Sequence, residues 1–107
     1  MTVEEVFDCI LSYSKKVNTN PERDLSNIYN QEFDGYSVGC VINKIIEKSI
    51  YEVYLYVVLG KDKIASSLLQ FEVEDVVEAN NYFEKLKIVV NEGNLNNILE
   101  LCKKNSN

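Results

Sequence analysis

The sequence predicts an α+β fold in which a three-stranded antiparallel β-meander is flanked by helices at both ends of the chain. Two observations lead to this prediction. Apolar residues recur with a helical period near both ends, and β-branched and aromatic residues gather in three runs between them. The expected order is α-α-β-β-β-α-α, in a single compact domain over residues 1–107 with an ordered core of about 2–102.

The first segment predicts an amphipathic helix over residues 3–17. Thr2 and Glu5 match a capping box, in which each side chain accepts a hydrogen bond from the other residue's backbone N–H. The apolar residues that follow recur every three or four positions, so they line one helical face. A polar run over residues 18–20 ends the segment.

A second, shorter helix is expected over about 21–30. Pro21 suits the first position of a helix, where its missing N–H costs nothing. Three apolar residues then fall on one helical face: Leu25, Ile28 and Tyr29. Asp34 and Gly35 indicate a turn that leads into the next element.

Three runs over residues 36–46, 50–59 and 63–73 predict the strands of the meander. They are joined by three-residue connections, and such short loops permit antiparallel hairpins, whereas parallel pairing needs long crossovers. The first run also fits a helical face. Gly39 and the density of β-branched residues favour a strand there.

The helical period returns after residue 73. One apolar stripe that begins near Val76 predicts a long helix, which Gly93 would close because glycine is favoured just after helix ends. Asn94 can cap a final short helix. The apolar positions of that helix are Leu95, Ile98, Leu99 and Cys102.

Composition and charge limit the classes of function. The 107 residues carry a net charge of −6, which disfavours nucleic acid because affinity for phosphates comes mainly from clustered Lys and Arg. No run approaches the roughly 18 apolar residues of a membrane span. The acidic start of the chain is unlike a secretory signal. We therefore expect a cytoplasmic protein that binds neither nucleic acid nor membranes.

Residue types that common catalytic sites need are scarce. The chain has no histidine, which removes Ser-His-Asp, Cys-His and H-E-x-x-H arrangements. Its four glycines cannot form the dinucleotide or phosphate loops. The three cysteines, Cys9, Cys40 and Cys102, lack a metal-binding spacing and are expected to be buried free thiols. We therefore expect a protein that is not an enzyme and that holds no cofactor or metal.

The densest acidic cluster is formed by Glu72, Glu74, Asp75 and Glu78, where the third strand meets the following helix. Negative side chains at a helix N-terminus interact favourably with its exposed N–H groups, which is the simplest interpretation. A divalent-cation site and a surface for a basic partner are the alternatives. The spacing matches no EF-hand loop.

The middle strand is apolar on both of its faces. Its expected core face carries Tyr51, Val53, Leu55, Val57 and Leu59. The opposite face carries Glu52, Tyr54 and Tyr56 and is too apolar to remain wholly exposed. Either helices cover both faces of the sheet, or a partner binds the second face through these three residues, since tyrosine is enriched at interfaces.

The expected function is binding to another protein. We expect a small acidic inhibitor of an enzyme, such as an immunity protein, an antitoxin-like neutraliser or a phage counter-defence protein. Its partner would have a basic surface, because complementary charge speeds association. The alternative is a self-associating structural or chaperone-like subunit, which would form a homodimer. A small-ligand-binding domain is the third hypothesis.

Overall fold

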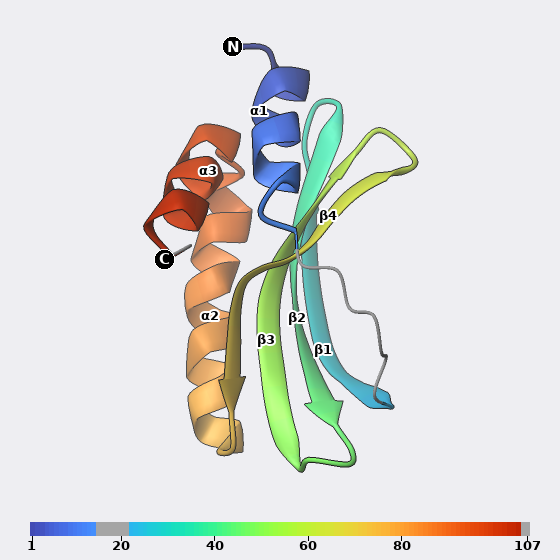
Figure 1. Ribbon diagram of the computed structural model, residues 1–107, viewed down its shortest axis with the longest axis vertical. Helices are drawn as coiled ribbons and strands as arrows, with labels where there is room; N and C mark the ends of the chain where they lie inside the picture. Colours follow the sequence, from blue (N-terminus) through green and yellow to red (C-terminus); the bar gives the residue numbers. More distant parts are fainter. Residues whose placement is uncertain (15–21, 106–107) are drawn as a thin grey trace.

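In the computed structural model, which describes residues 1–14 and 22–105, three helices pack on one face of a four-stranded antiparallel sheet (Figure 1). The elements are α1 Val3–Leu11, β1 Arg23–Glu32, β2 Tyr36–Ile45, β3 Ile50–Leu59, β4 Lys63–Val73, α2 Val76–Glu92 and α3 Leu95–Lys104. The strands lie in the order β1-β2-β3-β4, so each pairs with its neighbour in the chain. The α+β class is confirmed, but the predicted order of elements is wrong by one strand and one helix.

The helix predicted over about 21–30 is wrong, because Arg23–Glu32 forms strand β1. The apolar stripe that suggested a helix is divided between the two faces of the sheet. Tyr29 points toward the helices, where its hydroxyl donates to Asn91 of α2, while Leu25 and Ile28 belong to the opposite face. The serine and asparagines of this segment are weak helix formers, and β2 provides backbone hydrogen-bonding partners along its length.

Helix α1 begins as predicted but ends early. Both hydrogen bonds of the predicted capping box are present. The helix ends at Leu11, and the Ser12 hydroxyl donates to the carbonyl of Cys9, a local bond by which serine competes with helix continuation. Residues 15–17 of the predicted helix, and Pro21, lie outside the described residues.

The hydrophobic core lies between the helices and the inner face of the sheet. Its strand residues are Val38, Cys40 and Ile42 from β2, Val53, Leu55 and Val57 from β3, and Ala65 and Leu68 from β4. The core face predicted for the middle strand is therefore confirmed, with Tyr51 and Leu59 only partly buried at its ends. Phe7, Ile10, Phe83 and Ile98 are the largest buried side chains from the helices.

The C-terminal helices match their prediction. Gly93 ends α2 in the left-handed conformation, with φ of 59°, and the Asn94 side chain caps α3. The Gly93 carbonyl accepts a 2.6 Å hydrogen bond from the Tyr36 hydroxyl. A Cβ at Gly93 would lie 2.1 Å from the Phe33 ring, so the turn between β1 and β2 is fitted against the junction of α2 and α3.

Strand β4 is irregular, because it twice places two residues opposite one residue of β3. Such β-bulges bend a strand and redirect its side chains. Ser67 and Leu69 have φ of 56° and 51°, in the left-handed region that costs a non-glycine residue about 1–2 kcal/mol. As a result Leu68 and Leu69, which are adjacent in the chain, both pack against the core.

No helix among the described residues is long and apolar enough to cross a membrane.

Candidate partner-binding face

The candidate site is the face of the sheet that points away from the helices, which we call the outer face. Strand register and the alternation of side chains assign its members. They include Arg23, Leu25, Ile28 and Asn30 of β1, Val41, Asn43 and Ile45 of β2, Ile50, Glu52, Tyr54, Tyr56 and Val58 of β3, and Ile64, Gln70 and Glu72 of β4. Among the described residues, no helix packs on this face, since the core that the helices share contains only inner-face strand residues.

Three large apolar side chains of the outer face are more than half exposed. Leu25 is 60% exposed, Ile28 51% and Ile64 56%. Ile28 is the cross-strand partner of Val41, and Val41 is the partner of Tyr54, so these three side chains form a row across the sheet. Cross-strand partners on one face are in contact, so the three residues form an apolar row in which Val41 is buried, Tyr54 is half-buried and Ile28 is exposed.

The Glu52 carboxylate lies beneath this surface and is only 4% exposed. Its Oε1 is 2.5 Å from Arg23 Nε and also accepts from Asn43 Nδ2 at 3.2 Å. Its Oε2 accepts from Gln70 Nε2 at 3.3 Å. A buried carboxylate needs such partners, because an unpaired charge is costly away from water. Glu52 was predicted to contact a partner, but its carboxylate is engaged within the sheet.

The two predicted tyrosines occupy different environments. The Tyr56 ring lies across Gly39, where an added Cβ would be 2.3 Å from the ring, and its hydroxyl accepts a 2.8 Å hydrogen bond from Asn30. The Tyr54 hydroxyl has only a long 3.5 Å bond from Asn43. Both rings are half-buried. Tyr54 is therefore the less constrained of the two.

The four acidic residues at the junction of β4 and α2 are all exposed. Asp75 is the N-cap of α2 and accepts from the backbone N–H of Val77, and Glu78 lies in the first turn. The helix-terminal interpretation is thus confirmed for these two residues. Glu72 lies on the outer face opposite Glu52 and accepts from Gln70. Within the described parts of the chain, no group of cysteine, aspartate and glutamate side chains could hold a metal ion.

Sequence reasoning missed Arg23, Asn43 and Gln70, which surround Glu52, and Leu25 and Ile28, which extend the apolar surface. The two apolar residues were missed because their segment was predicted to be a helix. Asp34 and Gly35 were the signal that could have corrected this, since Asp-Gly between apolar segments is a strong hairpin indicator. If the segment before that turn is a strand, Leu25 and Ile28 both lie on a sheet.

The three cysteines are free. Burial raises the pKa of the Cys40 thiol to about 12 and that of Cys102 to about 11. Both side chains belong to the core, and Cys9 packs partly buried against it. Burial in apolar surroundings disfavours the reactive thiolate form of Cys40 and Cys102.

No family model, curated protein or solved structure matches this chain.

Proposed function

We propose that this chain is a protein-binding domain whose outer face docks onto a partner with a basic surface. The observation that carries the proposal is the pair of exposed apolar residues Leu25 and Ile28 on β1, with half-buried Tyr54 two strands away on the same face, which has no helix among the described residues. Apolar side chains that gather on one face are typical of interaction surfaces, whereas scattered ones are not.

The composition of the face supports a protein partner. Tyr54 combines an apolar ring with a polar hydroxyl, the combination that favours tyrosine at interfaces. It ends the apolar row and lies beside the hydrogen-bonded group around Glu52, which holds the surrounding side chains in place. A rigid surface loses less conformational entropy when it binds.

The charge supports a basic surface on that partner. Glu72 lies on the outer face itself, and Glu74 is exposed just beyond the end of β4. With a net charge of −6, the chain would be attracted to a positively charged protein and repelled from a negative one. Glu52 contributes less to this attraction because Arg23 neutralises it locally.

Within this proposal, the function that we favour is inhibition of an enzyme by covering its basic active-site cleft in the cytoplasm. An immunity protein, an antitoxin-like neutraliser and a phage counter-defence protein are the kinds of inhibitor that we consider. Self-association through the same face is the second candidate, and the exposed Leu25 and Ile28 would serve it equally.

A pair of matched variants tests the proposal. Ile28→Asp places a charge on the outer face, and Ile88→Asp places one on α2, where Ile88 is 60% exposed. The proteins that co-purify with the unmodified chain from its native host are identified, and their binding to each purified variant is measured. We expect Ile28→Asp to weaken binding at least tenfold and Ile88→Asp to leave it unchanged, while an enzyme partner loses activity when bound.

Equal binding by the two variants would remove the outer face as the site. Light scattering after size-exclusion chromatography separates the two candidates. A concentration-dependent dimer that Ile28→Asp disrupts would support self-association, and a monomer at high concentration would exclude it.

A further inference from the structure

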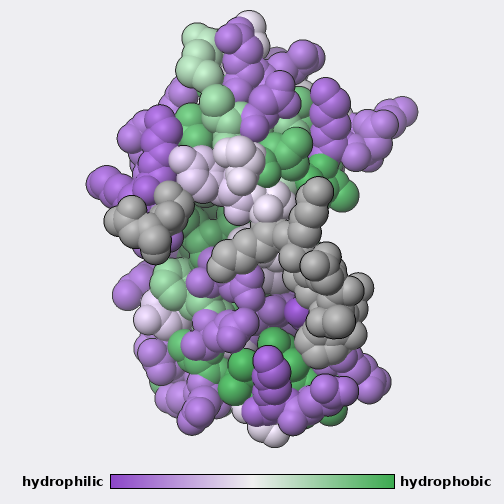
Figure 2. Space-filling model, viewed as in Figure 1, coloured by the Kyte–Doolittle hydropathy of each residue, from purple (hydrophilic) through white to green (hydrophobic). Residues whose placement is uncertain are grey.

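A groove runs between β4 and the helices α2 and α3, on the helix side of the sheet. It consists of two neighbouring cavities of about 180 and 260 Å³, which share Leu69, Phe71 and Asn105 as lining residues. Each is smaller than the roughly 300–1,000 Å³ typical of sites for drug-sized ligands, which suits a small or narrow ligand. Figure 2 shows hydrophobic side chains recessed in a hollow near the middle of the molecule as it is viewed there.

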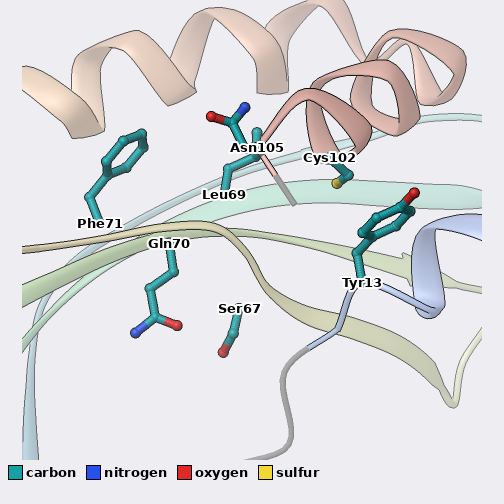
Figure 3. A pocket seen from close by; sticks show the side chains of 7 residues that line it. All are labelled: Tyr13, Ser67, Leu69, Gln70, Phe71, Cys102 and Asn105. Atoms are coloured by element: carbon teal, nitrogen blue, oxygen red, sulfur yellow. The ribbon is translucent and has the colours of Figure 1, made fainter. Parts of the chain in front are cut away.

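Aromatic and aliphatic side chains line most of the groove. The Phe71 and Tyr82 rings stack with their centroids 4.1 Å apart, at the end formed by α2. Figure 3 shows Tyr13, Leu69, Phe71, Cys102 and Asn105 on one side of β4, and the side chains of Ser67 and Gln70 on its other side. The side chains of Ser67 and Gln70 therefore point away from the groove, and those of Leu69 and Phe71 form its floor.

The backbone of β4 is strained where it forms this floor. Ser67 and Leu69 both have positive φ, and the bulges turn Leu69 toward the helices beside Leu68. A regular strand would avoid this strain. Non-glycine residues held in the left-handed region cluster at ligand-binding and catalytic sites, where surrounding structure maintains them. Here the strained segment borders an open cavity, which links the strain to the groove.

The charge at the groove is opposite to that of the whole chain. Lys85 lies at its wall, with Nζ 5.7 Å from the centroid of the Tyr82 ring. Among the described lining residues of the two cavities there is no aspartate or glutamate, although the chain has 17 acidic and 11 basic residues. An apolar groove with a lysine at its wall favours a ligand that has an apolar body and a negative group.

We propose that this groove binds an aliphatic carboxylate, with its chain along Leu69, Phe71 and Val89 and its carboxylate near Lys85. The elongated, partly open shape suits a flexible chain. Lys85 is exposed, so its ammonium group can pair with the carboxylate without being removed from water. This site does not depend on the outer face, so the two proposals can fail separately.

Calorimetric titration with two surfactants of equal chain length, both below their micellar concentrations, tests the charge preference. We expect dodecanoate to bind with one-to-one stoichiometry and to raise the melting temperature. Dodecyltrimethylammonium, which has a positive head group, should bind at least tenfold more weakly. Absence of dodecanoate binding, or equal affinity for the two, would overturn the proposal.

Three variants test the position of the ligand. Val89→Phe fills the groove and should reduce dodecanoate affinity more than tenfold, and Leu101→Phe serves the same purpose if Val89→Phe does not fold. Lys85→Gln should weaken dodecanoate by about two- to fivefold, the size of an exposed ion pair, and leave dodecanol unchanged. Lys48→Gln, in the turn between β2 and β3, is the matched control. Unchanged affinity in the filled variant, or equal losses in the two lysine variants, would exclude this site.

Discussion

The carboxylate of Glu52 has three side-chain donors around it, from Arg23 on β1, Asn43 on β2 and Gln70 on β4. One residue thus connects all four strands on the outer face. Because the carboxylate is almost fully buried, its interactions are screened by water much less than those of an exposed ion pair.

We expect Glu52→Gln to lower the free energy of unfolding by about 2 kcal/mol, because Arg23 loses its anionic partner in a largely buried site. Glu84→Gln is the matched control, since Glu84 is 67% exposed and pairs with Lys87 on the surface of α2. That change should cost less than about 0.5 kcal/mol. Urea denaturation at pH 7 measures both, and equal losses would contradict a special role for Glu52.

At the scale of elements, β4 stores strain in its bulges. We expect Ser67→Gly to raise the free energy of unfolding by about 1 kcal/mol, because glycine adopts positive φ without a steric cost. Ser66→Gly is the control, because Ser66 has no positive φ and only the flexibility of the unfolded chain would increase. It should destabilise the fold by about 0.5–1 kcal/mol. Thermal denaturation measures the stability of both variants. Destabilisation by Ser67→Gly would mean that the backbone is not strained at Ser67.

Elements with a long and unambiguous pattern could be predicted from the sequence. The strands at 50–59 and 63–73 and both C-terminal helices are confirmed, because their periods extend over many residues and their ends carry turn or cap residues. β1 could not be assigned in this way, because a bulge between Leu25 and Asn27 breaks its alternation, so that Leu25 and Ile28 share one face and Tyr29 lies on the other. The bulges of β4 have no glycine to mark them, so their left-handed residues look ordinary in the sequence.

At the scale of the whole molecule, the distribution of charge should control how fast a partner associates. We expect Glu72→Lys combined with Glu74→Lys to slow association with a basic partner by about tenfold at low salt, and much less at 0.5 M salt, where screening shortens the range of the field. Asp75 is left unchanged because it caps α2. Stopped-flow kinetics at several ionic strengths measure the rate. A loss that did not depend on salt would indicate a direct contact instead.

The candidate site could be predicted only in part. Strand alternation placed Glu52, Tyr54 and Tyr56 together on one face of β3, and the structure agrees. The neighbours of these residues come from β1, β2 and β4, and their positions depend on strand register and on the bulges. Side-chain partnerships across several strands are long-range features, which periodicity along the chain does not contain.

The order of the strands has a consequence for the synthesis of the chain. Because the sheet follows the chain from β1 to β4, each hairpin can pair as soon as its second strand leaves the ribosome. The inner face is then complete before α2, which covers much of it, has been made. During that interval the apolar residues of both faces are open to solvent. A nascent chain that stalls before residue 76 would therefore expose the apolar inner face of its sheet, which α2 and α3 help to cover in the finished protein.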